Sequence, residues 1–244
     1  MKKRNWLIQP QSDKDADMIV IEKLLRRDKI LQFSQVEYNE DSERYGKDMI
    51  PVGDIPYIER WLWKNHQKKM IPIEVPEILR KEEFLGRSYR IVDRDKIPYD
   101  TGGKYFIKNV SRLKEFNSAL YEGMVPMPST LPAGHYVVSS WVDIRSEFRV
   151  FVYKDEILAI QNYLGSPLVF PQAEKLMKMV MQYQGDNRRP KAYTLDIAVI
   201  CKQDQTTDTI LLEIHPFACC GLYGFADPDI PDMLEAGIQY YTEN

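Results

Sequence analysis

The sequence predicts an α+β fold, in which strands pair mainly antiparallel and helices cover the sheets. From residue 104 onward, the segments follow the order strand, helix, strand, strand, strand, helix, strand, strand. Successive strands are also joined by short polar turns, at residues 154–155 and around residues 204–205. Such tight connections join antiparallel strands, whereas a doubly wound parallel sheet needs a crossover between strands.

Composition restricts the class of protein. The chain has 244 residues, of which 44% are hydrophobic and 28% charged, so wholesale disorder is excluded. The net charge is −3 and the basic residues are scattered, which argues against a dedicated nucleic-acid surface. Three cysteines without a Cys-x-x-Cys spacing indicate neither a disulfide framework nor a zinc motif. Because no apolar run approaches membrane-spanning length, we expect a reduced, cytoplasmic protein with no membrane partner.

The first 80 residues predict a separate α/β lobe, and residues 81–244 a second region. In the lobe we expect strands at 6–8 and 31–38, a short apolar segment at 50–53, and helices at 13–31 and 55–65. Asp13 is expected near the start of the first helix. Prolines at 72 and 76 block regular structure, so residues 70–80 are expected to connect the two parts.

The second region is expected to contain more strands than helices. We expect strands at 104–110, 135–142, 147–153 and 156–163, a hairpin at 193–217, and helices at 172–183 and 231–241. A further helix is expected after Ser111, because Leu113, Phe116, Leu120 and Tyr121 are spaced for one helical face.

Strand alternation also predicts a register and a set of faces. Pairing about residues 154–155 would set Arg149 opposite Ile160. In the last strand, Ile210, Leu212 and Ile214 would share one face, and Leu211 would point the other way.

The hairpin at residues 193–217 places acidic residues together. Alternation puts Asp196 on the polar side of the first strand, and Glu213 and His215 on one side of the second. A turn centred between residues 204 and 205 sets Asp196 directly opposite Glu213. Like charges across a ladder repel unless a cation lies between them, so we expect a divalent metal site. The alternative is that both acids lie on the solvent face of an edge hairpin.

Two basic residues lie inside strands whose neighbours are apolar. Lys108 follows Y-F-I, and Arg149 lies between a phenylalanine and a valine. A buried cation needs an anionic partner, either a protein carboxylate or a ligand phosphate. Alternatively, Lys108 is an edge lysine that reaches water along its stem, and Arg149 pairs with Glu147, two positions before it.

Together these residues predict one site for a nucleotide and a metal ion. Mg²⁺ prefers a few carboxylates plus phosphate oxygens, and two acids are too few for an all-protein cage. A nucleotide would supply the missing oxygens, and Lys108 and Arg149 would balance the phosphate charge.

Several short motifs, in this order, resemble the ATP-grasp superfamily. They are Y-F-I-K, V-V-S-S-W-V, S-E-F-R-V-F-V with A-I-Q-N-Y, L-D-I-A-V and L-L-E-I-H-P-F, and they extend over residues 105–223. The likeness is to a divergent branch. It includes phage and bacterial ATP-grasp proteins and the eukaryotic cell-division-cycle assembly factor for a translation-initiation complex. Two parts of this resemblance are the most specific: the motif E-F-R-V-F-V, and D-I-A followed by E-I-H-P-F.

This resemblance implies an ATP-grasp fold, in which ATP lies between two α+β lobes. It implies that Lys108 and Arg149 contact the phosphates and act in catalysis, with Lys108 also at the adenine edge. The ligands of Mg²⁺ or Mn²⁺ would be Asp196, Glu213 and His215. The implied nucleotide site also includes a hinge segment that contacts the adenine, formed by Ser139, Ser140, Trp141 and Val142. One acidic residue, Glu147, completes it.

The resemblance also implies an activity. The wider family activates a carboxylate as an acylphosphate, which an amine or thiol then attacks. We therefore expect an ATP- and metal-dependent ligase joining a carboxylate to an amine, with an acceptor such as a peptide or protein end. The alternative is an ATP-binding assembly or chaperone-type factor of the same fold with little turnover. A protein kinase is excluded because neither His-Arg-Asp nor Asp-Phe-Gly occurs. A metal-dependent phosphodiesterase would leave Lys108 and the strand order unexplained.

Three features depart from the family's pattern. His215 stands where asparagine is usual, and imidazole suits Mn²⁺ or Zn²⁺ better than Mg²⁺, unless His215 only hydrogen-bonds to a ligand. After Lys108 the sequence reads N-V-S-R-L-K in place of a glycine-rich lid, which makes the exclusion of water harder to explain. Asn162 replaces a basic residue and so removes one phosphate contact.

Overall fold

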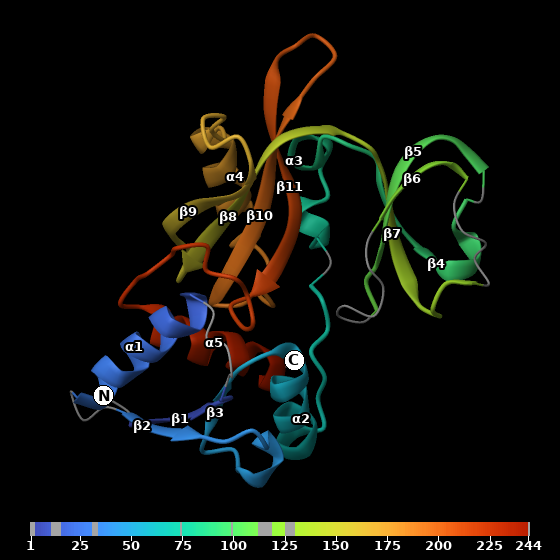
Figure 1. Ribbon diagram of the computed structural model, residues 1–244. Coiled ribbons are helices and arrows are strands. Elements are labelled where there is room, and N and C mark those ends of the chain that lie inside the picture. Colours follow the sequence, from blue (N-terminus) through green and yellow to red (C-terminus); the bar gives the residue numbers. More distant parts are fainter. Residues whose placement is uncertain are drawn as a thin grey trace.

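The computed structural model describes residues 3–10, 16–30, 34–73, 75–98, 100–111, 119–124 and 130–243. These residues form three sheets, of three, four and four strands (Figure 1). Both four-stranded sheets are antiparallel, which confirms the predicted α+β class. Among the described helices, none is long and apolar enough to cross a membrane.

The N-terminal lobe is an α/β unit with a parallel sheet. Strand β1 (Arg4–Ile8) lies between β2 (Ser34–Tyr38) and β3 (Ile50–Val52), and it pairs with both in parallel. Helix α1 (Ala16–Ile30) forms the crossover from β1 to β2, and α2 (Ile55–His66) follows β3. These elements agree with the prediction from the sequence. Asp13 and residues 31–33, at the ends of the predicted helix and strand, lie outside the described residues.

Helix α5 (Ile230–Glu243) brings the end of the chain back to this lobe (Figure 1). Met233 packs in one apolar cluster with Trp6 of β1. Gly237 allows the close approach, because a Cβ there would lie 2.1 Å from the carbonyl oxygen of Phe217. The predicted closing helix therefore packs against both the N-terminal lobe and Phe217, at the end of the hairpin predicted at residues 193–217.

The predicted connector at residues 70–80 has little regular structure. Ile73 forms an isolated bridge with Ile214, and a single 3₁₀ turn covers Glu77–Leu79. A short helix, α3 (Glu82–Leu85), follows and ends at Gly86, whose φ of 58° is left-handed.

The smaller four-stranded sheet has the order β4-β7-β5-β6. Its strands are β4 (Tyr89–Asp93), β5 (Asp100–Asn109), β6 (Ala119–Met124) and β7 (His135–Ser140). The helix predicted after Ser111 is wrong where the chain is described, because Leu120 and Tyr121 pair with β5 in strand β6. Pairing with β5 satisfies the backbone hydrogen bonds and overrides the local helical spacing. Leu113 and Phe116 lie outside the described residues.

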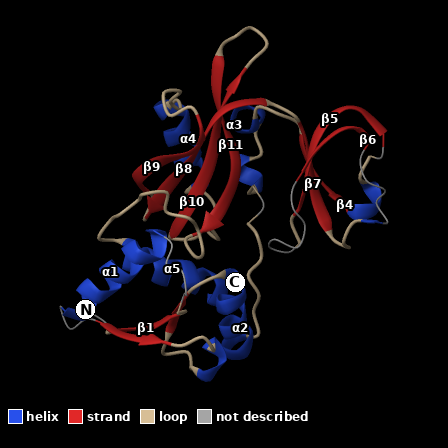
Figure 2. Ribbon diagram, viewed as in Figure 1, coloured by secondary structure: helices blue, strands red, loops and turns tan. Residues whose placement is uncertain are grey.

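The central sheet has the order β11-β10-β8-β9. Its strands are β8 (Asp143–Tyr153), β9 (Glu156–Gly165), β10 (Ala192–Cys201) and β11 (Thr207–Pro216). Helix α4 (Ala173–Tyr183) and α3 cover one face, where Leu176 and Phe84 pack with Leu195 and Val150 (Figure 2). The opposite face of the sheet carries the polar residues of the site.

The predicted register of β8 and β9 holds next to the turn, but it is wrong by one residue at Arg149 and by two at Glu147. Arg149 pairs with Gln161 rather than Ile160, and Glu147 pairs with Leu164. The cause is a pair of bulges, one between Phe151 and Val152 and one between Glu147 and Phe148. A bulge adds one residue to a strand and leaves no mark in the alternation of a short sequence.

Candidate active site

Strands β10 and β11 form the predicted hairpin, and Asp196 lies directly opposite Glu213, as expected. A β-bulge follows this pair, because Ile197 is paired with Leu211 and Leu212 is the extra residue. Between the bulge and the turn, the side chains of β11 therefore point to the faces opposite to those predicted from Glu213. Leu211 is buried in the core under α4, whereas Leu212 lines a cavity.

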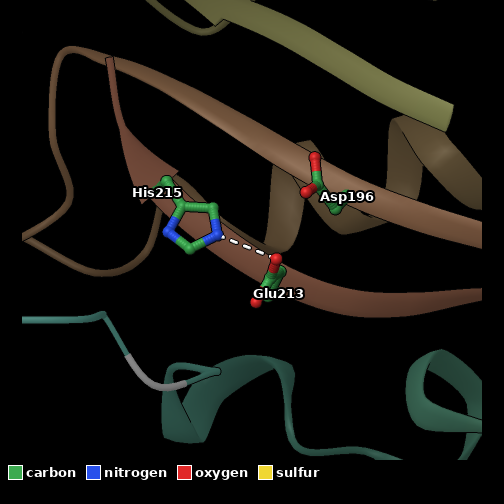
Figure 3. A group of neighbouring side chains, drawn as sticks. All are labelled: Asp196, Glu213 and His215. Atoms are coloured by element: carbon green, nitrogen blue, oxygen red, sulfur yellow. Dashed lines mark ion pairs between the residues drawn. The ribbon is translucent and has the colours of Figure 1, made fainter. Parts of the chain in front are cut away.

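Three potential metal ligands converge at this point of the hairpin (Figure 3). Asp196 lies on β10, and Glu213 and His215 lie on β11; one ligand atom from each lies within 4.8 Å of the others. His215 Nε2 is 3.0 Å from Glu213 Oε1, and Asp196 is only 2% exposed. Two carboxylates and an imidazole form a donor set that suits a divalent cation.

Each of the two carboxylates is paired with a basic side chain. Arg149 donates through Nε and Nη2 to the two oxygens of Asp196, at 2.8 and 2.7 Å. Lys108 reaches across from the smaller sheet to form an ion pair with Glu213. The alternative pair of Arg149 with Glu147 is not observed; Glu147 instead accepts a hydrogen bond from Tyr163, at 2.6 Å.

These contacts set the ionisation of Glu213 and Arg149. Burial raises the pKa of Glu213, but the hydrogen bond from His215 and the nearby Lys108 ammonium outweigh it and hold that pKa well below its usual range. Burial likewise lowers the pKa of Arg149, but its hydrogen bonds to Asp196 prevail and raise that pKa. Glu213 and Arg149 are therefore both charged at neutral pH.

Aromatic rings hold the arginine in place. The rings of Tyr163 and Tyr223 are stacked, with centroids 5.0 Å apart, and the Arg149 guanidinium lies 5.1 Å from the Tyr223 ring. Arg149 Nη1 also donates to the carbonyl of Gly221, at 3.1 Å. The guanidinium thus contacts Asp196, Gly221 and the ring of Tyr223.

A cavity of about 550 Å³ opens between the smaller sheet and the central sheet. This volume is in the range that holds small-molecule ligands. Six predicted nucleotide contacts line it: Lys108, Ser139, Ser140, Trp141, Val142 and Glu147. Glu213 lines it as well, whereas Arg149, Asp196 and His215 lie outside its lining. Asp196 and His215 lie next to Glu213, and Arg149 is paired with Asp196.

Sequence reasoning missed several lining residues, among them the charged residues Arg87 and Asp143. The guanidinium of Arg87 donates to the carbonyls of Leu85 and Leu211, at 3.0 and 2.8 Å, and burial lowers the pKa of Arg87 to about 10. Within the described parts of the chain, no carboxylate pairs with it. The only sequence signal is Gly86, whose left-handed conformation ends α3 directly before Arg87.

Comparisons with known proteins agree with this architecture. The model of an ATP-grasp domain, R2K clade family 2, matches residues 84–233, which is more than half of the 244 residues. Among curated proteins there is no significant match.

Solved structures match over nearly the whole chain. A D-alanine–D-alanine ligase from Bacillus anthracis, complexed with ATP, has a TM-score of 0.58 at 12% identity, covering 100% of this chain and 99% of that one. The ATP-grasp ligase PsnB, complexed with precursor peptide PsnA2 and AMPPNP, has a TM-score of 0.54 at 10% identity, covering 97% and 98%. N5-carboxyaminoimidazole synthetase from Staphylococcus aureus, complexed with ADP, has a TM-score of 0.55 at 10% identity, covering 99% and 78%.

At these identities, the likeness to solved structures shows a shared fold alone. The family match and this fold agree with the motif order Y-F-I-K, E-F-R-V-F-V, L-D-I-A-V and E-I-H-P-F. The chain therefore belongs to the ATP-grasp superfamily, as a member of R2K clade family 2.

Proposed function

We propose that this chain is an ATP- and divalent-metal-dependent ligase that joins a carboxylate to an amine, or a similar nucleophile, through an acylphosphate. One observation carries the proposal: a lysine from one sheet and a metal-type carboxylate from another, Lys108 and Glu213, meet at the wall of a cavity of about 550 Å³. The similar solved ligases, which are complexed with ATP or AMPPNP, support it.

The metal-type cluster would hold Mg²⁺ or Mn²⁺. Asp196, Glu213 and His215 supply two carboxylates and an imidazole, and phosphate oxygens would complete the coordination. When bound, the ion would stabilise the charge that develops on the transferred phosphoryl group. Glu213 suits this role because its lowered pKa keeps it ionised.

The basic residues would take the phosphates. Lys108 and Arg149 are paired with the two carboxylates, and both would turn to phosphate oxygens once a cation neutralises Glu213 and Asp196. Arg87, which lines the same cavity, would add a third positive charge. These charges would orient the phosphates and offset the negative charge of the transition state.

The adenine would bind against the strand-to-strand segment that leads from β7 to β8. Ser139, Ser140, Trp141 and Val142 line the cavity there. Glu147 also lines it, and one of its oxygens accepts from Tyr163, which leaves the other for a hydroxyl of the nucleotide.

Within this proposal, residues 81–244 form the nucleotide- and metal-binding region and residues 1–80 form a lobe beside it. The acceptor would be an amine-bearing molecule such as a peptide or protein. The PsnB structure, which contains a precursor peptide, supports that choice of acceptor.

The test is release of ADP and inorganic phosphate, measured with Mg²⁺ or Mn²⁺ and with panels of carboxylates and amines. We expect release only when both a carboxylate and an amine are present, and none from Glu213→Gln. Release that is independent of any acceptor, and equal in wild type and variant, would contradict the proposal.

A binding protein of the same fold is the second candidate. It is favoured by the sequence N-V-S-R-L-K after Lys108, where a glycine-rich lid would exclude water during acyl transfer. ATP and metal would then raise the melting temperature without ADP release under any acceptor.

A further inference from the structure

Strand β10 buries a hydroxyl group close to the three potential metal ligands. Thr194 is 0% exposed, and among the described residues its Oγ1 has no hydrogen-bond partner. A buried hydroxyl that makes no hydrogen bond costs free energy, whereas a valine of nearly the same shape would not carry this cost. The hydrogen bonds of the metal-free fold therefore give no reason for a hydroxyl at this position.

The register of the central sheet sets this hydroxyl beside His215. Thr194 pairs directly with His215 across the β10–β11 ladder, and no bulge separates this pair from that of Asp196 with Glu213. Directly opposed residues share a face, with their Cβ atoms about 4.5–5.5 Å apart. Alternation along β10 also puts Thr194 on the same face as Asp196. The hydroxyl therefore lies on the face of the hairpin that carries the potential metal ligands.

The neighbour of Thr194 on the other side cannot take part in a hydrogen bond through its side chain. On β8, Thr194 pairs with Phe151. The ring of Phe151 stacks on that of Phe225, with centroids 4.1 Å apart, inside an apolar cluster. Of the two residues directly opposite Thr194, only His215 is therefore polar.

An imidazole that binds a cation needs an acceptor on its far side. As a ligand it is neutral, so it binds through one ring nitrogen and carries its proton on the other. That second N–H generally donates to a nearby acceptor, which fixes the tautomer and the orientation of the ring. Nε2 of His215 lies 3.0 Å from Glu213 Oε1 and is the nitrogen on the side of that carboxylate (Figure 3). Nδ1 would carry the proton, and a threonine hydroxyl can accept it in a hydrogen bond.

We propose that Thr194 is a positioning residue for the metal site: its Oγ1 accepts from Nδ1–H of His215 and so directs Nε2 to the cation. The inference rests on the metal site of the proposed function, and it adds a residue that does not contact the ion itself. In the metal-free fold, Glu213 holds the ring through Nε2. Released from that contact, the ring turns about its Cα–Cβ bond, and the buried hydroxyl gains a partner.

Two substitutions of Thr194 test this role in the full chain. Thr194→Val removes the hydroxyl and keeps the branched shape, whereas Thr194→Ser keeps a hydroxyl. Calorimetry with ATP and excess Mn²⁺ should show binding about 10- to 100-fold weaker in Thr194→Val, the usual effect of losing a group that orients a metal ligand. Thr194→Ser should bind nearly as tightly as wild type, and the affinity for adenosine should be the same in all three proteins. Equal affinity of Thr194→Val and wild type for ATP with Mn²⁺ overturns the proposal.

Pulsed electron paramagnetic resonance of the same Mn²⁺ complexes reports on the ring directly, because it detects an imidazole nitrogen bound to the ion. We expect this nitrogen signal in wild type and in Thr194→Ser, and a reduced signal in Thr194→Val. A signal of equal strength in all three proteins would show that the hydroxyl does not direct the ring, and it overturns the proposal.

The melting temperature of the metal-free chain separates positioning from a structural role. Thr194→Val should keep or raise it, because the variant removes a buried hydroxyl without a partner. Thr209→Val is the matched control: Thr209 is equally buried on the same hairpin, but its Oγ1 accepts from the backbone N–H of Gln172, at 2.7 Å. This control should lower the melting temperature and leave the affinity for ATP with Mn²⁺ unchanged. A Thr194→Val chain that loses stability and affinity together overturns the proposal.

A double-mutant cycle shows whether the hydroxyl acts through His215. In the background His215→Ala, which keeps both carboxylates, there is no ring to orient. Thr194→Val should therefore cause no further loss of affinity for ATP with Mn²⁺ in that background. The same loss with and without the imidazole overturns the proposal.

Turnover and binding separate this inference from the ligase proposal. If wild type releases no ADP with any acceptor, while Thr194→Val still weakens the binding of ATP with Mn²⁺, the ligase proposal fails and this inference stands. If wild type releases ADP and Thr194→Val binds as tightly as wild type, this inference fails alone. If Mn²⁺ gives wild type no gain in ATP affinity, the metal site fails and this inference with it.

Discussion

Lys108 of β5 and Glu213 of β11 form an ion pair that joins the smaller sheet to the central sheet beside the nucleotide cavity. Arg149 and Asp196 form a similar pair. In each pair, a basic residue proposed to contact phosphate is bound to a carboxylate proposed to hold the metal ion. Lys108 and Glu213 are partly exposed, whereas Arg149 and Asp196 are buried, and removing one partner of a buried pair leaves an uncompensated charge and is costly. The metal ion would take the place of the basic side chains beside the two carboxylates, and the phosphates would take the place of the carboxylates beside Lys108 and Arg149. Metal and nucleotide would therefore have to bind together.

Metal and ATP should consequently bind with strong positive coupling. We expect Mn²⁺ or Mg²⁺ to raise the affinity for ATP by about 5- to 150-fold, the usual range of coupling between two sites. Isothermal titration calorimetry with and without the ion measures this factor. Adenosine is the control, because it lacks phosphates and its affinity should not depend on the metal. Equal ATP affinity in both conditions would show that the two pairs do not exchange partners.

Lys108→Ala should weaken ATP binding by about tenfold or more, because it removes a charged hydrogen-bond donor to the phosphates. Calorimetry with ATP and with adenosine separates the phosphate contact from the rest of the site. Lys96→Ala is the matched control, since Lys96 lies outside the cavity lining and pairs with Asp93 at an exposed position. An unchanged ATP affinity in Lys108→Ala would remove this lysine from the site.

The pairing of Asp196 with Glu213 could be predicted because strand alternation and one turn position determine it. The partners of Lys108 and Arg149 could not, since each depends on how separate strands meet in space. Arg87 was missed for the same reason, because its place in the cavity depends on the turn at Gly86. Sequence periodicity describes the faces of one element and carries little information on which elements approach each other.

Secondary structure was predicted well where a segment determines its own environment, as in α2, whose N-terminus is capped by Asp54. It failed at β6, where pairing with β5 overrides a helical spacing of apolar residues. The β-bulge beside Asp196 was also missed, so Leu211 and Leu212 point opposite to the predicted directions. Both failures have a tertiary cause.

Glu213→Gln should abolish the stabilisation that metal and ATP give, because the amide cannot supply the charge that a divalent cation requires. Differential scanning fluorimetry with ATP and Mn²⁺ measures the shift in melting temperature. Glu122→Gln, an exposed change on β6, serves as the control and should behave as wild type. A metal-dependent shift retained in Glu213→Gln would place the ion elsewhere.

The pH dependence of stability should report the lowered pKa of Glu213. Folding lowers this pKa below the ordinary value of 4.5, so the ionised carboxylate stabilises the metal-free fold above about pH 4.5, and this contribution is lost as the pH falls. The difference in unfolding free energy between wild type and Glu213→Gln should therefore be largest near neutral pH and shrink in acid. Urea denaturation across this pH range measures it. A difference that grows in acid would mean that the carboxylate is protonated in the fold.

His215→Asn should move the metal preference toward Mg²⁺. An imidazole nitrogen favours Mn²⁺ or Zn²⁺, whereas an amide oxygen is a harder ligand that suits Mg²⁺. The comparison is the ratio of ATP affinities with Mn²⁺ and with Mg²⁺, measured by calorimetry in wild type and variant. His135→Asn changes an exposed histidine that pairs with Asp93 on the smaller sheet, and it should leave the ratio unchanged. Because His215 Nε2 lies 3.0 Å from Glu213, a histidine that only orients this carboxylate would lower the affinity for both ions alike. A changed ratio therefore identifies His215 as a metal ligand, and an equal loss for both ions identifies it as a positioning residue.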